Sequence, residues 1–585
     1  YACVPPTHFI TWNMPSQIQE NWEAYQDKET GGQTLNMYGY GDGGSGCTEE
    51  MLEMIRRFDK VSVMPKIEVT GGDAFLHKNL KDNTNLATWD GELYLEMHRG
   101  TFTTKSNLKK ANRTLEFKLR ETELRAALAS LTGTSYPSEE LTECYKKFLL
   151  NQFHDILPGS HIHPVYEDAM NDYRSVSERL DAMLALTAGN EYFNSLNFTR
   201  SSITFIEDEN GAITRHGVKG FWSIPTLAGL STGTVAALPS KENWLSTEFC
   251  DKCDCLVVET PYYRAKLSSD GSFVSLYDKE LDREWVKEGC GFNKLHLYAD
   301  NPGVYDAWDI LPNYKDVQVA LNVDKPLALV SSDGSSAEFA VTFTTEKSTW
   351  KMILRFFADS RAIEVENVVD WDEKHKLVKV NFGPDVLTRE LVCDTSAGFV
   401  KRDLTKNTSW QQARFEVCHH KWCDMSESGS GIAIINEGKY GVGLEKDEIS
   451  LSLLRATIRP DITSDIGHHD FCYTILPHSG DAVEAQVNKT AMEYNVPLCK
   501  SNVTVPAALR DTLNNCGLYL QAMKRSEDGQ YLILRLSEQD GRRGKIAFPF
   551  KVQTMNLIED IEGSTKVVSY HPFELITVAV KPEDL

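Results

Sequence analysis

The sequence predicts a multidomain α+β protein composed of an α/β segment, a three-helix bundle and antiparallel β-sandwich domains. The chain has 585 residues, enough for roughly three to four domains. Apolar residues first recur with helical spacing and then, beyond about residue 191, in short alternating runs. A composition of 41% hydrophobic and 25% charged residues is typical of soluble globular proteins that can bury a sizeable core.

Residues 1–75 combine loop-like stretches with one clear helix and one apolar run. Thr48 can cap a helix over EEMLEMIRRF, whose glutamates suit the first turn and whose apolar side chains share one face. The next run, VSVMPKIEVT (residues 61–70), predicts a strand. A strand, a loop and a helix together indicate a piece of an α/β domain.

Residues 76–190 have a helical period throughout. A long segment rich in Lys, Arg and Glu carries a stripe of apolar side chains from Leu108 to Leu131. Pro137–Glu140 predicts the start of a second helix, and Pro164 suits the first turn of a third. Three amphipathic helices with short connections predict a bundle.

Beyond residue 191, short β-like runs are broken by Gly, Asp, Asn and Pro. In YYRAKLSSDGSFVSLYDKE the pair Asp270-Gly271 predicts a hairpin turn, and EDGQYLILRLSE repeats the pattern. We expect a large β-sandwich region at residues 191–500 and a C-terminal β domain at residues 501–585.

Charge and cysteine content restrict the partners and the compartment. The formal charge of -23 argues against a nucleic-acid partner, and no apolar run approaches the 18 residues of a membrane span. Thirteen thinly spread cysteines do not form a disulfide framework, which favours a reducing, cytoplasmic location. Cys250, Cys253 and Cys255 form a C-x2-C-x-C group, but no second pair lies at a useful spacing, so structural zinc is the less favoured interpretation.

A glycine-rich stretch, YGYGDGGSG (Tyr38–Gly46), precedes the capped helix. Four of the six residues from Gly41 to Gly46 are glycine, which permits positive φ and close approach of a ligand. The stretch lacks the Lys-Ser/Thr pair of a P-loop and the preceding strand of a dinucleotide site. Asp42 is therefore a candidate general acid, provided that a pocket raises its pKa. The alternative is a plain glycine-rich turn with an Asx cap.

The stretch LLNQFHDILPGSHIHP (residues 149–164) ends an apolar run with His154-Asp155, before a Pro158-Gly159 pair that should stop a helix. Adjacent side chains on a helix point about 100° apart, so one ion cannot conveniently take both. We expect His154 to ligate a metal ion and Asp155 to orient it or to contact a substrate. The alternative is a histidine that satisfies carbonyls at a helix end. His161 and His163 are expected to be loop and helix-entry residues rather than ligands.

Long strings in chain order resemble glycoside hydrolase family 38, the α-mannosidases, and are most similar to its cytosolic and bacterial branch. They cover nearly the whole chain from Tyr38 onward. They include YGYGDGGSG, GELYLEMHRGTFTTKSNLKKANR (Gly91–Arg113), LLNQFHDILPGS, YDAWDI (Tyr305–Ile310), VDWDEKHKLVKV (Val369–Val380) and NEGKYGVGL.

The resemblance implies a retaining α-mannosidase that removes terminal α-linked mannose from oligosaccharides. It implies an α/β catalytic domain, of which residues 1–75 would be the C-terminal part, followed by the bundle and the β-sandwiches. One divalent ion, Zn²⁺ or Co²⁺, would be held by two histidines and two aspartates. Matched to the family strings, His154 would be a metal ligand, Asp155 would contact mannose and Asp42 would be the general acid. Ser45 departs from the family's all-glycine run.

Two family patterns do not occur in the N-terminal part of the sequence: a His-x-Asp ligand pair and the E-P-D-x-F-G-Y string that supplies the nucleophile. In relatives both precede the position where this chain begins, so the resemblance implies either an N-terminally truncated sequence or a missing part that is a separate chain. In both cases the 585 residues lack the nucleophile and are expected to be inactive alone. Relatives often associate, so a homo-oligomer is possible. One alternative is a non-catalytic carbohydrate-binding or scaffolding relative. Another, a mutarotase-like sandwich enzyme, would explain only the C-terminal half.

Overall fold

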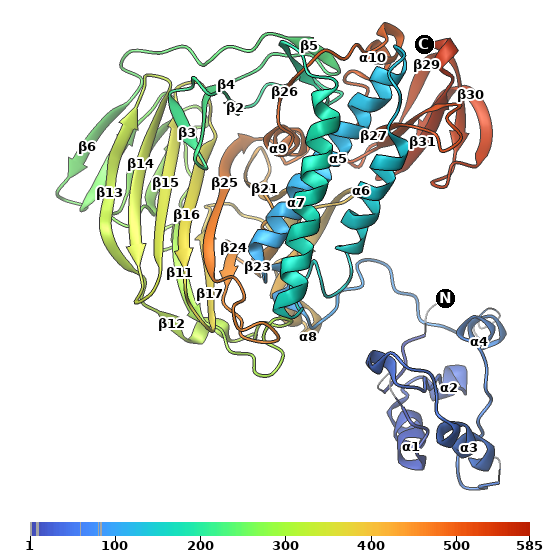
Figure 1. The fold of residues 1–585 in the computed structure, drawn as a ribbon. Coiled ribbons are helices and arrows are strands. Elements are labelled where there is room, and N and C mark those ends of the chain that lie inside the picture. Colours follow the sequence, from blue (N-terminus) through green and yellow to red (C-terminus); the bar gives the residue numbers. More distant parts are fainter. Residues whose placement is uncertain (1–2, 8–10, 59, 80, 82–84) are drawn as a thin grey trace. The chain divides into compact units, whose positions relative to one another are not determined.

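The computed structural model describes residues 3–7, 11–58, 60–79, 81 and 85–585 (Figure 1). It divides into two compact units, residues 1–94 and 95–585. Helices together with many antiparallel sheets confirm the predicted multidomain α+β class.

The first unit contains helices α1 (Pro15–Ala24), α2 (Lys28–Gly31), α3 (Glu49–Phe58) and α4 (Gly72–Asn79), with a 3-10 turn η1 at Gly41–Gly43. Helix α3 is the one expected from the sequence. The hydroxyl oxygen of Thr48 accepts a 3.3 Å hydrogen bond from the backbone N–H of Met51, and Met51 and Phe58 are buried.

The strand expected at residues 61–70 is not formed, so this prediction was wrong. The segment is a turn followed by irregular chain, in which the Val63 and Val69 side chains are 88% and 60% exposed. A strand needs a partner for its backbone hydrogen bonds, and the described part of residues 1–94 contains no strand. The structure therefore forms helical elements of this segment but not the sheet of an α/β domain.

The second unit begins with the predicted bundle of α5 (Ser106–Ser130), α6 (Ser138–Leu150) and α7 (His163–Ala185). Helix α6 starts directly after Pro137, and Pro164 lies in the first turn of α7, as expected. None of the helices in the described ranges combines the length and the apolar character needed to cross a membrane. The shared core is apolar and consists of Leu108, Leu115, Leu119, Leu141, Cys144, Phe148, Ala169, Tyr173, Val176 and Leu180.

Helix α6 ends at Leu150, not at Pro158-Gly159 as the sequence suggested. The Asn151 side-chain amide donates a 3.0 Å hydrogen bond to the carbonyl of Lys147, which satisfies an acceptor of the last turn. The chain then leaves through successive turns up to Gly159.

Two antiparallel sheets form the large sandwich. The nine-stranded sheet has the order β13 (Asn322–Ser332), β14 (Ser336–Thr344), β15 (Thr349–Phe357), β16 (Ile363–Trp371), β25 (Gly467–Ser479), β22 (Ser430–Asn436), β21 (Trp422–Glu427), β18 (Glu390–Thr395) and β19 (Gly398–Asp403). The six-stranded sheet has the order β12 (Gln318–Val319), β11 (Phe292–Ala299), β17 (Lys376–Phe382), β24 (Glu448–Arg455), β23 (Gly441–Glu445) and β20 (Glu416–Cys418).

The two sheets meet through aromatic side chains. Tyr473 of β25 packs edge-on against Phe382 of β17 with ring centroids 5.7 Å apart. Its hydroxyl donates a 2.6 Å hydrogen bond to the side-chain oxygen of Asn293 on β11. This face-to-face packing confirms the predicted sandwich.

Smaller elements complete the unit. A five-stranded sheet has the order β10 (Arg283–Glu284), β9 (Phe273–Asp278), β8 (Tyr263–Leu267), β7 (Cys255–Glu259) and β6 (Ser246–Cys250), with the expected turn at Gly271. There are also two three-stranded sheets. The first has the order β26 (Cys499–Ser501), β1 (Glu191–Asn194) and β5 (Ser231–Gly233). The second has the order β2 (Thr204–Glu207), β4 (Val218–Ser223) and β3 (Ile213–Arg215). Short helices are α8 (Ser409–Ala413), α9 (Val487–Asn495) and α10 (Ala507–Leu513), with 3-10 turns at Arg99–Phe102, Tyr314–Asp316 and Pro582–Asp584.

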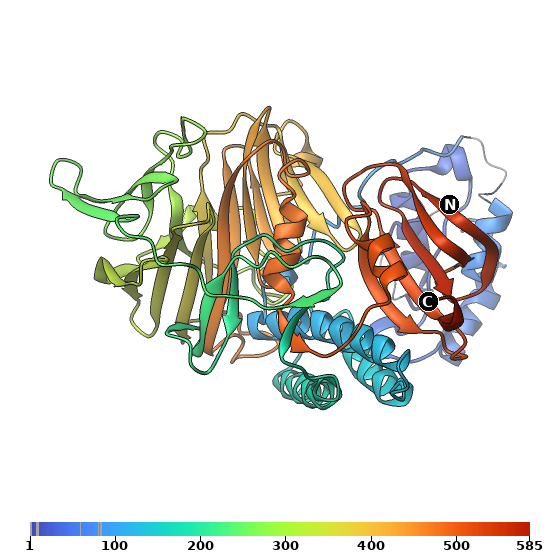
Figure 2. The same cartoon turned by 90° about the horizontal axis from the view of Figure 1, so that it is seen from above.

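The C-terminal sheet packs against α5, seen beside the sheets in Figure 2. Its strand order is β27 (Tyr519–Arg525), β28 (Leu532–Ser537), β31 (Leu575–Val580), β29 (Gly544–Met555) and β30 (Ile561–Tyr570). Arg120 of α5 is buried and donates hydrogen bonds to the carbonyls of Ser195 and Leu520, at 3.0 and 2.9 Å. Helix α5 is thus tied to the bundle on one face and to the β domains on another.

Candidate active site

His154 and Asp155 lie in the turn between α6 and α7. The expectation that they lie at the end of a helix was therefore wrong. The His154 side chain is 76% exposed, and its Nε2 lies 3.6 Å from Oδ2 of Asp155. The imidazole rests against the Phe153 ring, with centroids 4.3 Å apart. The turn therefore presents an imidazole and a carboxylate side by side, both accessible to a ligand.

Helix α5 holds this turn in place. The buried Lys109 ammonium donates hydrogen bonds to the carbonyls of Leu157 and Pro158, at 2.9 and 3.1 Å. Burial lowers the pKa of Lys109 to about 7. Gly159 has φ +85°, and a Cβ there would lie 2.6 Å from the carbonyl oxygen of Thr104. Only glycine allows this approach, so the turn is fixed against the start of α5.

The two carboxylate oxygens of Asp155 have different surroundings. Oδ1 accepts hydrogen bonds from the Ser160 hydroxyl at 2.6 Å and from the indole N–H of Trp308 at 3.2 Å. Oδ2 lies beside the His154 ring and remains available to a ligand. Because Oδ1 is held by two donors, the carboxylate has a defined orientation.

Trp308 belongs to an anchored loop of the β region. The buried Arg455 guanidinium donates hydrogen bonds to the carbonyls of Asp306 and Asp309, at 2.8 and 2.7 Å. The Asp306 carboxylate in turn accepts the backbone N–H groups of Ile458 and Arg459. The loop therefore brings an indole to Asp155 from a position 153 residues away in the sequence.

Exposed aromatic rings flank the two polar side chains. Tyr305 is 69% exposed and makes an edge contact with Trp308, with centroids 5.8 Å apart; Phe153 is 56% exposed. Sequence reasoning assigned no role to Trp308 or Tyr305. The signal was the string YDAWDI, in which each aromatic residue is followed directly by an aspartate.

Asp42 lies in the first unit, on η1, and its side chain is exposed. Gly41 and Gly44 have φ of +47° and +65°, and the Gly44 N–H donates to the Gly41 carbonyl at 3.0 Å, so the glycines serve the positive φ expected of them. A cavity of about 1000 Å³ in this unit is lined in part by Tyr38 of the same stretch. The role of Asp42 as the general acid stays a prediction.

The other two histidines of the stretch lie where the sequence placed them. His161 is a buried loop residue whose ring stacks on Tyr166, and burial lowers its pKa. His163 is the first residue of α7, and its Nδ1 lies 3.1 Å from the Asp461 carboxylate.

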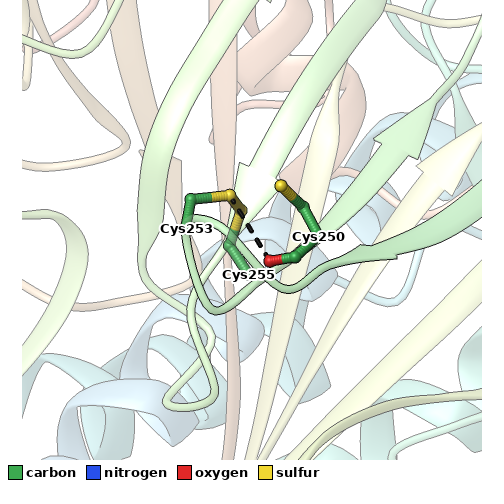
Figure 3. A group of neighbouring side chains, drawn as sticks. All are labelled: Cys250, Cys253 and Cys255. Carbon is green, nitrogen blue, oxygen red and sulfur yellow. Dashed lines mark hydrogen bonds between the residues drawn. A yellow bond between two sulfur atoms is a disulfide. The ribbon is translucent and has the colours of Figure 1, made fainter.

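The three cysteines of the C-x2-C-x-C group meet at the end of the β6–β7 hairpin (Figure 3). Cys253 and Cys255 are joined in a disulfide, and Cys250 pairs across the strands with Cys255. Since two of the three sulfurs are bonded to each other, the group offers no set of zinc-ligating thiolates in this form. The other cysteines form no disulfide in the part of the chain that the structure describes.

His154 fits the role of a metal ligand. Within the described ranges its ring makes no hydrogen bond, and the Asp155 oxygen at 3.6 Å adds negative charge beside it. An exposed neutral imidazole is a good donor to Zn²⁺ or Co²⁺. Elsewhere in the described residues, two groups hold three ligand atoms within 4.8 Å of one another: the cysteine group, and His216 with Glu437 and Cys472.

Four sequence-family matches follow one another along the chain. The glycosyl hydrolases family 38 N-terminal domain matches residues 4–92, and the alpha mannosidase middle domain matches residues 96–189. The family 38 C-terminal domain matches residues 258–463, and its C-terminal beta sandwich domain matches residues 517–578.

Curated relatives and a solved structure agree with these matches. The chain is 30% identical to human "Alpha-mannosidase 2C1" over 561 residues, covering 91% of this chain and 53% of the relative. It is 31% identical to "Alpha-mannosidase" of Saccharomyces cerevisiae over 497 residues, covering 79% of this chain and 43% of the relative. The chain thus spans about half the length of the curated relatives it matches. The crystal structure of an alpha-mannosidase from Enterococcus faecalis V583 shares the fold, with a TM-score of 0.71 at 13% identity, over 94% of this chain and 76% of that one.

Proposed function

The chain belongs to glycosyl hydrolase family 38, and we propose that the protein is a retaining, metal-dependent α-mannosidase. Its substrate is an oligosaccharide with a terminal α-linked mannose, and the 13 cysteines, thinly spread over 585 residues, favour a cytoplasmic location. The observation that carries the proposal is the rigid turn that presents His154 and Asp155 beside exposed aromatic rings.

Asp155 and the aromatic rings suit a sugar. Oδ2 of Asp155 can accept a hydrogen bond from a sugar hydroxyl, while Ser160 and Trp308 hold Oδ1. The exposed ring of Tyr305 and the half-buried ring of Trp308 can pack against the C–H face of a pyranose ring. A carboxylate next to an aromatic surface thus supplies both the polar and the apolar contacts of a carbohydrate site.

His154 would hold the divalent ion, Zn²⁺ or Co²⁺. When bound, the ion supplies Lewis acidity and orients adjacent hydroxyls of the sugar. A ring nitrogen of His154 would donate its lone pair to the ion.

Asp42 would act as the general acid that protonates the departing glycosidic oxygen. A retaining mechanism also needs an attacking carboxylate roughly 5 Å from the acid. The sequence contains no match to the family string that supplies this nucleophile, so we assign the role to no residue of this chain.

Two substitutions test the proposal in protein expressed from its complete gene, with an aryl α-mannoside as substrate. Asp42→Asn and His154→Ala should each lower kcat/KM at least ~100-fold, because each removes a group that acts on the reacting sugar. Asp73→Asn and His571→Ala are matched controls on exposed residues and should retain activity. Full activity in Asp42→Asn would remove Asp42 as the acid. An unmodified protein that binds manno-oligosaccharides without cleaving them would favour a non-catalytic carbohydrate-binding role.

A further inference from the structure

Three residues far apart in the sequence meet at one face of the nine-stranded sheet. His216 forms the β3–β4 turn with φ +50°, Glu437 follows the end of β22, and Cys472 lies on β25. The Cys472 sulfur lies 3.3 Å from Nε2 of His216, and the same nitrogen lies 3.4 Å from Oε2 of Glu437. The Cys472 side chain is fully buried, while those of His216 and Glu437 are 14% and 16% exposed.

These separations match those between ligands on one metal ion. A Zn–S bond of about 2.3 Å and a Zn–N bond of about 2.0 Å at a tetrahedral angle place sulfur and nitrogen about 3.5 Å apart. All three donor atoms lie within 4.8 Å of one another. One thiolate, one imidazole and one carboxylate form a donor set suited to Zn²⁺ or Co²⁺.

The neighbouring residues leave one ring nitrogen of His216 and one oxygen of Glu437 available to a metal ion, as the residues around metal ligands usually do. Nδ1 of His216 is buried, makes no hydrogen bond and lies 3.1 Å from Oδ2 of Asp470. Because Nδ1 faces this second carboxylate, Nε2 is the nitrogen available to bind the metal ion. Arg215 donates a hydrogen bond to Oε1 of Glu437, so Oε2 is the free oxygen, and it is the one that faces His216.

The electrostatics of the cluster agree with bound positive charge. The Glu437 carboxylate accepts a hydrogen bond from Arg215, and its Oε2 lies 3.4 Å from Nε2 of His216. Asp470, Glu366 and Glu364 add further carboxylates, countered by Lys110, Arg215 and Arg355.

We propose that His216, Glu437 and Cys472 form a metal site, separate from His154, that binds one Zn²⁺ or a similar divalent ion and fastens the β3–β4 turn to the large sheet. The three ligands come from three segments, so the ion stabilises contacts between them. When the Cys472 sulfur binds the ion, its thiol proton passes to solvent.

Cobalt is the probe that reports this site, because a thiolate bound to Co²⁺ gives a charge-transfer absorption band. The full chain is reduced, stripped with a chelator and titrated with CoCl₂ without oxygen. The expected result is one equivalent of thiolate-bound Co²⁺, displaced by ZnSO₄, and a higher Tm in the presence of metal. Absence of the band in the unsubstituted protein would overturn the proposal and leave the cluster as a polar network without metal.

Variants assign the band to its residues. Cys472→Ser should abolish it, and a band that survives in this variant would overturn the proposal. His216→Asn removes the imidazole but tolerates the positive φ, and should weaken Co²⁺ binding at least ~100-fold. If Cys472→Ser fails to fold, an unchanged affinity of His216→Asn for Co²⁺ overturns the proposal instead.

Two control variants should keep the band. In Cys253→Ser/Cys255→Ser, a retained band shows that the thiols of the β6–β7 hairpin do not produce it. His154→Ala should also keep it, so this test is independent of the proposed mannosidase function.

Discussion

At the scale of single residues, Asp155 connects the helical bundle to the β region. One of its oxygens is held by Ser160 and Trp308, and the other is free beside His154. The hydrogen bonds to Oδ1 thus fix the orientation of the Asp155 carboxylate, and Oδ2 is available to a ligand. A hydrogen bond to a charged acceptor contributes about 1.5–3 kcal/mol, so loss of the Trp308 donor should be measurable.

Trp308→Phe tests this link. The substitution keeps an aromatic surface but removes the N–H donor, and we expect kcat/KM for an aryl α-mannoside to fall about 10-fold. Asp155→Asn should lower it further, because the negative charge that faces the sugar is lost. In the double variant the two losses should not add, since both act through one carboxylate. Fully additive losses would show that Trp308 acts on the substrate and not through Asp155.

At the scale of elements, the turn between α6 and α7 depends on its contacts with α5. Gly159 and Lys109 fix the turn by steric fit and by hydrogen bonds to its carbonyls. The turn therefore has a defined shape although it belongs to no helix or strand.

Gly159→Ala should disturb the turn more than Gly133→Ala. Both glycines have positive φ, at +85° and +99°, so both substitutions carry a backbone strain of about 1 kcal/mol. Only at Gly159 would the new Cβ clash, whereas nothing lies within 4 Å at Gly133. We expect the Tm to fall clearly more for Gly159→Ala, with faster hydrogen exchange at residues 153–159. Equal effects of the two substitutions would show that the approach to Thr104 does not restrain the turn.

Lys109 should give the protein a specific pH dependence. Its pKa falls from about 10.4 in the unfolded chain to about 7 in the folded protein. Between these values the unfolded chain binds the extra proton, so this group makes stability increase from pH 7 to pH 10. In Lys109→Met that contribution is absent, and the increase in Tm over this range should be smaller. An identical pH profile in both proteins would contradict the burial effect.

The spacing of apolar residues in the sequence predicted most helices and strands, because it indicates which face of each element is buried. The start of α3 at its Thr48 cap and the starts of α6 and α7 followed from local residues. The strand at residues 61–70 failed, since a strand depends on a partner elsewhere. The contact between Asp155 and Trp308 and the meeting of His216 with Cys472 could not be predicted, because nothing local indicates which distant segments pack together.

At the scale of the whole molecule, the bundle and the β domains form one unit around α5, with Arg120 and Lys109 as buried links. His154 and Asp155 project from this rigid unit, so a metal ion bound there should have a fixed geometry relative to the Tyr305–Ile310 loop. The proposed activity should therefore depend on the ion itself.

Metal removal tests that dependence. A chelator should abolish most mannosidase activity, and Zn²⁺ or Co²⁺ should restore it. The His216→Asn variant serves as the control: it removes the other proposed ion site, and its activity should remain equally sensitive to the chelator. Activity that persists after complete removal of metal would contradict the role given to His154.

The most direct test of the central claim is a crystal structure of the protein expressed from its complete gene, bound to a mannose-configured inhibitor, with anomalous data that locate the metal. We predict an ion about 2.0–2.1 Å from a ring nitrogen of His154, an Asp155 oxygen hydrogen-bonded to the sugar, and the Asp42 carboxyl within hydrogen-bonding reach of the position of the glycosidic oxygen. An inhibitor bound elsewhere, with the His154 ring in solvent and Asp42 remote from the sugar, would contradict the account.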